Sequence, residues 1–236
     1  MTIEVLPRSE PEAASWATAL SVAGALVNIP WVLIGAQMVM LLEQEAGVPT
    51  GRTTGDIDAL VDVRALAGAT RSAADRLLAA GFDAVGTGHP YRFQRGLEQV
   101  DLLAPDHLGR RVDLTTMPPG VTTQVPGGTR ALATRRHLSV RIVGAGSEGL
   151  LPVPSLAGAI VLKVRAWEAR QAPRDAEDLA RLLALSKDIE ALRASFKSNE
   201  RAALSRVGPL AADRSRTWSV AADPEDARAA FRRLTR

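Results

Sequence analysis

Hydrophobic and polar positions follow two different periods along the first 150 residues. Apolar residues recur at helical spacing over 11–27, 36–46 and 72–80, and Pro11 suits the first turn of a helix. Short apolar or alternating runs predict strands at 31–34, 56–62, 91–95, 99–103, 111–115 and 138–143. The mixture of periods predicts an α/β domain over residues 1–150.

The pattern changes after Pro152 and Pro154. Apolar residues now keep helical spacing throughout, which predicts helices at 156–170, 175–186, 188–204 and 224–235. We therefore expect an α+β protein, in which a mixed sheet with flanking helices is followed by a helical C-terminal domain over residues 151–236.

Composition excludes several classes of protein. Apolar residues make up 46% of the 236-residue chain and charged residues 23%, which are ordinary values for a folded domain rather than a disordered one. The chain has no cysteine, which removes disulfides, thiolate nucleophiles and zinc fingers. Its three histidines are widely spaced, so a histidine-rich metal site is not expected.

A charge-free run extends from Ser15 to Leu42. Its 28 residues are long enough to span a bilayer. However, Asn28 and Pro30 interrupt the run in its middle, and Glu10 and Glu12 precede it where a secretory signal would carry positive charge. We therefore expect a cytoplasmic protein that does not enter a membrane.

Net charge differs between the two parts of the chain. The formal net charge is +3, and residues 155–236 hold 16 basic against 11 acidic side chains. This excess is compatible with a polyanionic partner such as RNA, and equally with ordinary solvated helix faces.

The segment Asp56-Ile57-Asp58 carries the clearest sign of chemistry. Residues i and i+2 of a strand point to the same side, so the two carboxylates repel one another unless a cation lies between them. Hard oxygen ligands suit Mg²⁺, which is often shared with substrate phosphates. The alternative is a strand end at which both aspartates face water.

Two further segments support a metal and phosphate site. Gly35 ends one predicted strand and begins a helix, where backbone N–H groups can hold a phosphate. Asp101 lies among apolar residues in a strand that we expect beside the Asp56 strand. Three aspartates near a phosphate-binding turn are the groups required for two-metal phosphoryl or nucleotidyl transfer.

These motifs resemble those of a known family. Ile34-Gly35-Ala36 followed by Arg52-x-Thr54-x-Asp56-Ile57-Asp58 is similar to the signature of nucleotidyltransferases of the DNA-polymerase-β superfamily, in particular bacterial toxins of the AbiEii type. The family usually has Gly-Gly or Gly-Ser where this chain has Gly35-Ala36. This difference removes a hydroxyl contact to a phosphate and leaves the backbone contacts.

The resemblance continues in the second half and covers roughly residues 30–185. The segment 153–163 is similar to the family's helix with an essential lysine, here Lys163, one of only three lysines in the chain. Residues 174–179, Arg-Asp-Ala-Glu-Asp-Leu, resemble the family's Arg-Asp-x-x-Asp-Leu motif, in which the second aspartate, here Asp178, is the functional one.

The resemblance implies a role for each matched residue. Asp56, Asp58 and Asp101 would form the Mg²⁺ site, with Asp101 alternatively taking the proton of the attacking hydroxyl. Lys163 would stabilise the charge of the departing pyrophosphate. The remaining expected nucleotide contacts are Gly35, Ala36, Arg52, Thr54 and Asp175. Arg52 would neutralise phosphate and Thr54 would orient Asp56 or the nucleotide, each with a plain loop role as the alternative. Asp175 has a carboxylate at a helix start as its alternative role.

The implied activity is transfer of a nucleoside monophosphate from an NTP to an acceptor hydroxyl. The toxin resemblance implies an RNA end as acceptor, such as the 3′ end of a tRNA, and an antitoxin protein as a partner. Two alternatives remain open: transfer to a small molecule such as an aminoglycoside, and a catalytically idle interaction module. The retained Asp-x-Asp argues against the idle module.

Overall fold

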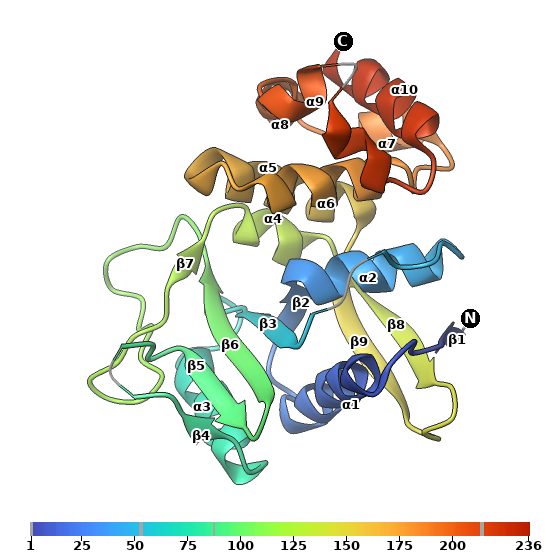
Figure 1. Cartoon of the computed structure of the whole chain (residues 1–236). Helices are drawn as coiled ribbons and strands as arrows, with labels where there is room; N and C mark the ends of the chain where they lie inside the picture. Colours follow the sequence, from blue (N-terminus) through green and yellow to red (C-terminus); the bar gives the residue numbers. More distant parts are fainter. Residues whose placement is uncertain (1, 52–53, 87, 213–214) are drawn as a thin grey trace.

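The computed structural model describes residues 2–51, 54–86, 88–212 and 215–236. Its strands form two sheets that helices surround, so the chain has an α+β fold that includes a mixed sheet (Figure 1). This agrees with the fold class that the hydrophobic pattern predicts.

The larger sheet has six strands in the order β2-β3-β6-β5-β4, with β7 paired to β6. They are β2 (Trp31–Ile34), β3 (Asp56–Val61), β4 (Asp83–Ala84), β5 (Arg92–Arg95), β6 (Glu98–Pro105) and β7 (Gln124–Val125). β3 runs antiparallel to β2 and parallel to β6. β3 is therefore an interior strand, and its last three residues are buried.

The smaller sheet contains β1 (Thr2–Val5), β8 (Arg135–Ile142) and β9 (Glu148–Pro154). β1 lies parallel to β8, and β8 and β9 form an antiparallel hairpin. β9 also lies close to β2, so an edge of this sheet meets an edge of the larger one (Figure 1). All four residues of β2 are buried at this junction, which explains its continuous apolar sequence.

The first half contributes α1 (Glu10–Ala25), α2 (Gly35–Glu45), α3 (Ala69–Ala79) and α4 (Gly128–Ala133). α1 begins at a Ser9 cap, whose hydroxyl accepts the N–H of Glu12, and Pro11 occupies its first turn. α4 begins after Gly127, because the Asp106 carboxylate accepts the N–H groups of Gly127 and Thr129 at 2.6 and 2.9 Å.

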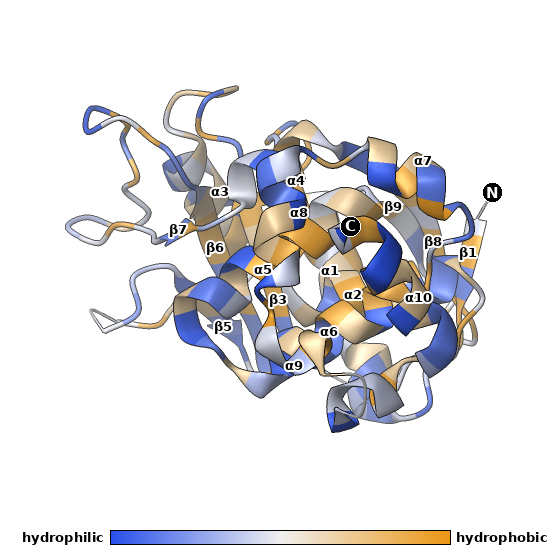
Figure 2. Cartoon of the chain, turned by 90° about the horizontal axis from the view of Figure 1, so that it is seen from above, coloured by the Kyte–Doolittle hydropathy of each residue, from blue (hydrophilic) through white to orange (hydrophobic). Residues whose placement is uncertain are grey.

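The second half is helical. It consists of α5 (Leu156–Arg170), α6 (Pro173–Leu183), α7 (Ile189–Ala194), α8 (Ser198–Ser205), α9 (Gly208–Ala211), the 3-10 helix η1 (Arg216–Val220) and α10 (Pro224–Thr235). α5 and α6 form a hairpin between the sheets and the outer helices (Figure 1). In Figure 2 the ribbons of α2 and α5 are largely hydrophobic, whereas α10 carries hydrophilic residues on the side seen there.

Several predicted elements agree closely with the structure. The strand at 31–34 and the helices at 156–170 and 224–235 have the predicted bounds, and the other predicted helices of residues 1–186 differ only at their ends. The predicted strand at 138–143 is confirmed as part of the longer β8. The expected neighbour of the Asp56 strand is confirmed as β6.

Two predicted elements are wrong. Residues 111–115 form no strand, because the Asp113 carboxylate accepts the N–H of Thr115 at 2.9 Å and closes a turn. The helix predicted over 188–204 is divided into α7 and α8. Lys197 between them is extended, and its N–H donates to Glu200 at 2.8 Å to begin α8.

The predicted domain boundary near residue 150 stays a prediction. The last strand ends at Pro154 and α5 begins at Leu156, while one cluster of buried apolar side chains continues from Ile3 to Leu234. Among the described residues, no helix is both long and apolar enough to cross a membrane. The charge-free run 15–42 is divided between α1, β2 and α2.

A buried ion pair joins the two halves. Arg181 of α6 contacts Glu43 of α2 at 3.2 Å, and their side chains are only 11% and 2% exposed. A Cβ at Gly51 would lie 2.5 Å from the Arg181 guanidinium, so this side chain also packs against the loop before β3. Burial raises the pKa of Glu43, and Arg181 opposes that rise.

We predict that Arg181→Met lowers the free energy of unfolding by about 3 kcal/mol, because it leaves the Glu43 charge buried without its partner. The double variant Glu43→Leu/Arg181→Met should recover part of this loss. Arg233→Met, which breaks an exposed pair with Glu190, is the matched control and should cost less than about 1 kcal/mol. Urea unfolding measures all three, and equal losses for the two arginines would contradict the prediction.

Candidate functional site

The pairing of β3 with β6 brings the predicted aspartates together. Asp58 lies directly opposite Asp101 in this parallel pair, and Asp56 precedes Asp58 by two positions on the same face. Asp56 is exposed, Asp58 is half-buried and Asp101 is 8% exposed. Three carboxylates from two neighbouring strands therefore form one cluster.

Gly35 lies against this cluster. Ile34 pairs with Asp58 across β2 and β3, and Gly35 follows with φ +74° as the first residue of α2. A Cβ at this position would lie 1.8 Å from Oδ2 of Asp58. Only glycine fits, since it allows both the left-handed backbone and the close approach of the carboxylate.

The α5–α6 hairpin supplies the lysine that faces the cluster. Nζ of Lys163 contacts Oδ2 of Asp178 at 2.7 Å, with the two side chains 6% and 1% exposed. Lys163 also counteracts the rise in the Asp58 pKa, so its charge acts on the β3 carboxylate. Asp178 thus fixes the position of Lys163 between the hairpin and the sheet.

Two arginines are held by carboxylates of the same site. Arg170, at the end of α5, donates to both oxygens of Asp175 at 2.6 Å, and Asp175 is fully buried. Arg92 of β5 donates to both oxygens of Asp101 at 2.8 Å. These bidentate bonds raise the pKa of each guanidinium, so both arginines stay charged.

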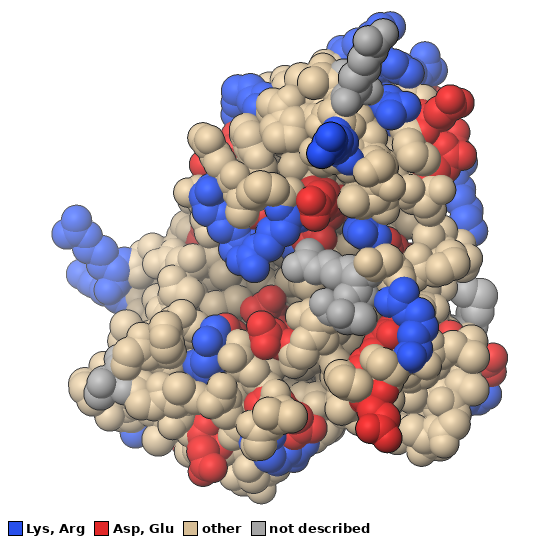
Figure 3. All heavy atoms as spheres, in the orientation of Figure 1, with Lys and Arg blue, Asp and Glu red and all other residues tan. Residues whose placement is uncertain are grey.

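All of these side chains line one cavity of about 420 Å³. Its lining residues are Gly35, Ala36, Thr54, Asp56, Asp58, Tyr91, Arg92, Asp101, Lys163, Arg170, Arg174, Asp175 and Asp178. Figure 3 shows acidic side chains in a hollow over the β3–β6 region, with Lys and Arg side chains gathered above it. The sheet side of the cavity thus presents Asp56, Asp58 and the Arg92–Asp101 pair, and the hairpin side presents the pairs of Lys163 and Arg170 with Asp178 and Asp175.

The negative charge of the cluster changes the acidity of Asp58. Burial is the largest cause, and together with the neighbouring Asp101 and Asp56 charges it raises the Asp58 pKa to about 6, against the opposing charges of Lys163 and Arg170. The cations of the site therefore only partly balance its carboxylates.

The cavity contains nine of the ten residues that the sequence indicates. Thr54 accepts the N–H of Asp56 at 3.3 Å, consistent with its expected orienting role. Arg52 lies outside the described residues. Asp175 accepts a hydrogen bond from Arg170 and lies in the first turn of α6. It therefore positions Arg170 in addition to its expected role at the helix start.

Sequence reasoning missed Tyr91, Arg92, Arg170 and Arg174. Arg170 follows Lys163 by seven residues on the same helix face, so helical periodicity could have identified it. Arg92 could not be identified, because its contact with Asp101 depends on the register of β5 and β6. Tyr91 and Phe93 alternate in sequence, and the structure separates their roles: Phe93 is fully buried, whereas Tyr91 lines the cavity.

Of the three aspartates predicted to bind Mg²⁺, two are suited to that role. Within the described ranges, no group of three or more histidine, cysteine or acidic side chains is arranged to hold a metal ion. Asp101 has both oxygens on Arg92, which leaves Asp56 and Asp58 as the carboxylates of the β3–β6 cluster that would hold a metal ion. Mg²⁺ is commonly bound by one or two carboxylates together with water and substrate phosphates, so these two suffice.

Comparison of the chain with models of known protein families, and with curated protein sequences, gives no match.

We predict that Gly35→Ala costs more stability than Gly47→Ala. Both glycines have positive φ, +74° and +75°, so each substitution should cost about 1–2 kcal/mol in backbone strain. Nothing lies within 4 Å of a Cβ at Gly47, whereas at Gly35 it would collide with Asp58. Thermal unfolding of both variants measures the difference. Equal losses of stability would mean that the Asp58 side chain moves away from the new Cβ without cost.

We predict that Asp58 contributes stability that is lost as the pH rises from about 4 to about 6 in protein freed of metal. The folded chain keeps a proton on Asp58 that the unfolded chain releases from a carboxyl of pKa 3.8, and this stabilisation is lost as the pH approaches about 6. Asp58→Asn should remove this component, on the order of 2 kcal/mol.

Urea unfolding at several pH values measures the difference between the variant and the parent protein. Asp83→Asn, which changes an exposed aspartate outside the cavity, is the matched control. If Asp58→Asn and Asp83→Asn show the same pH dependence, the Asp58 pKa is not raised.

Proposed function

We propose that the chain is a Mg²⁺-dependent nucleotidyltransferase with a polymerase-β-like core. The observation that carries this proposal is the convergence in one cavity of Asp56, Asp58 and Asp101 with Lys163 and the Gly35 turn. The carboxylates of β3 and β6, together with the cations Lys163 and Arg170 from the hairpin, suit a metal-chelated triphosphate, which needs both.

In the proposed reaction, an acceptor hydroxyl oxygen bonds to the α-phosphorus of an NTP. The bond from that phosphorus to the bridging oxygen of the β-phosphate breaks, pyrophosphate leaves, and the hydroxyl proton passes to the carboxylate cluster. Magnesium at Asp56 and Asp58 would supply neutralisation of phosphate charge.

The protein's own residues account for the rest of this chemistry. Lys163 stabilises the growing charge on pyrophosphate, and Asp178 holds its ammonium in place. Arg170, held by Asp175, provides a second cation at the same wall. Asp101 holds Arg92 at the edge of the cavity, and its proton-accepting role requires that this bond opens.

An RNA end is the proposed acceptor. It is supported by the excess of basic side chains in residues 155–236 and by the Lys and Arg side chains gathered above the cavity (Figure 3). The resemblance of the sequence to AbiEii-type toxins would imply a toxin role in the cytoplasm, opposed by an antitoxin protein. An aminoglycoside-type acceptor is the alternative, for which activity should depend little on salt.

We predict that purified protein with Mg²⁺ and labelled NTPs transfers label to total tRNA. Asp58→Ala and Lys163→Ala should each lower the rate by about 100-fold or more, because they remove groups that act on the reacting phosphates. Asp83→Ala and Lys187→Ala, exposed residues outside the cavity, are the matched controls and should keep the parent rate.

Each other outcome has a definite meaning. Label on an aminoglycoside panel instead of RNA would change the acceptor and retain the site. Activity that survives both Asp58→Ala and Lys163→Ala would refute the site assignment. Absence of transfer to any acceptor with every NTP would favour the idle interaction module. Growth inhibition on expression that Asp56→Ala relieves would support the toxin role.

A further inference from the structure

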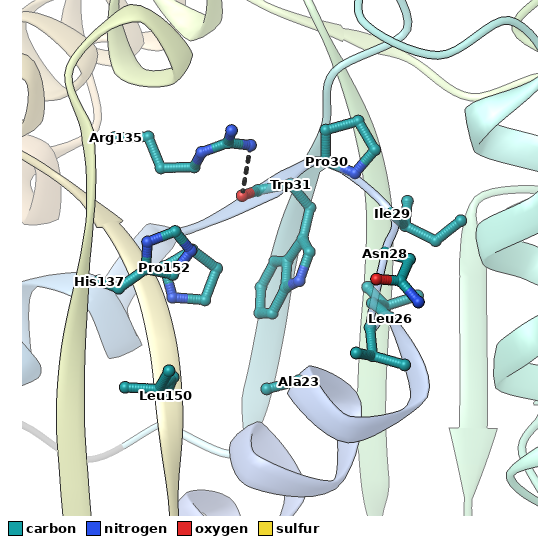
Figure 4. Close-up of a pocket in the computed structure, with 11 residues that line it drawn as sticks. Ala23, Leu26, Asn28, Ile29, Pro30, Trp31, Arg135, His137, Leu150 and Pro152 are labelled. Atoms are coloured by element: carbon teal, nitrogen blue, oxygen red, sulfur yellow. Dashed lines mark hydrogen bonds between the residues drawn. The ribbon is translucent and has the colours of Figure 1, made fainter.

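A second cavity of about 390 Å³ lies at the other end of β2 from the candidate site. It is bounded by the end of α1 and the turn that follows, the start of β2, and the β8–β9 hairpin (Figure 4). Trp31 begins β2 and Gly35 directly follows its end, which separates the two sites by roughly 13 Å at about 3.3 Å per residue.

Most of the cavity wall is apolar. Figure 4 shows the Trp31 indole between the hairpin residues on one side and the α1 end on the other. Val27 and Leu150, from these two sides, remain 54% and 60% exposed although both are large hydrophobic residues. An occupant that covers them would remove apolar surface from water.

The charge of the cavity has one sign. Among the described residues that line it, the ionisable side chains are Arg135 and His137, both basic and both exposed. The Arg135 guanidinium donates a long hydrogen bond of 3.5 Å to the Trp31 carbonyl. This bond uses one of five N–H donors, so others remain for a ligand.

We propose that this cavity binds a small organic anion in which a flat apolar ring system carries one carboxylate. The ring system covers the exposed Leu150 and Val27 side chains and packs beside the exposed His137 ring, whereas Trp31 is only 4% exposed and serves as part of the cavity wall. The carboxylate lies at the Arg135 edge, where a guanidinium binds it in bidentate geometry. This binding is independent of the proposed nucleotidyl transfer.

The test uses 1-naphthylacetate as the probe and isothermal titration calorimetry of the full chain. We expect saturable binding at one site, and binding at least tenfold weaker for 1-naphthylacetamide, which keeps the rings and lacks the charge. Arg135→Gln should weaken binding of the acid about tenfold and leave the amide unchanged.

Matched variants separate the cavity from general surface effects. Leu150→Glu should weaken binding of the acid more than tenfold, whereas Leu97→Glu, at an exposed leucine outside the cavity, should not change it. Arg141→Gln, on the same strand as Arg135, is the second control. Equal affinity for acid and amide, no effect of Arg135→Gln or Leu150→Glu, or no saturable binding would overturn the proposal.

Discussion

The negative charge of three aspartates on two neighbouring strands is the constraint around which the site is organised. Asp58 and Asp101 are opposite one another in an interior parallel pair, where water can screen them only in part. Arg92 balances Asp101 from within the sheet, and the charge of Lys163, from the helical half, lowers the pKa of Asp58. The raised pKa of Asp58 has burial as its largest cause and the Asp101 charge as the next, and Lys163 and Arg170 only partly oppose them.

The helical half contributes to this balance because α5 and α6 form a hairpin. The hairpin places two ion pairs across its gap: Lys163 with Asp178, and Arg170 with Asp175. Arg181, one turn beyond Asp178, extends the contact to α2. The helix that begins at Gly35 and the helix that orients Lys163 are thus fixed to one another.

Much of this arrangement could be predicted from the sequence. Periodicity placed β2, α2, β3 and α5, and the Asp-x-Asp spacing put two carboxylates on one face. What it could not predict depends on pairing between distant segments: the contact of Arg92 with Asp101, and the strand β9, which contains Pro152 and Pro154 and for which no strand was predicted. Prolines are tolerated there because β9 is an edge strand of its sheet.

The ion pairs of Lys163 with Asp178 and of Arg170 with Asp175 would also affect how the site binds a phosphate. Lys163 is held by a carboxylate that is 1% exposed, and Arg170 by one that is fully buried, so each cation is fixed from behind. Cations that are already in position need not reorganise when a phosphate arrives, which is the condition under which electrostatic stabilisation is most effective. The buried carboxylates Asp175 and Asp178 therefore serve the proposed reaction by orienting cations, while Asp56 and Asp58 present the oxygens that face the cavity.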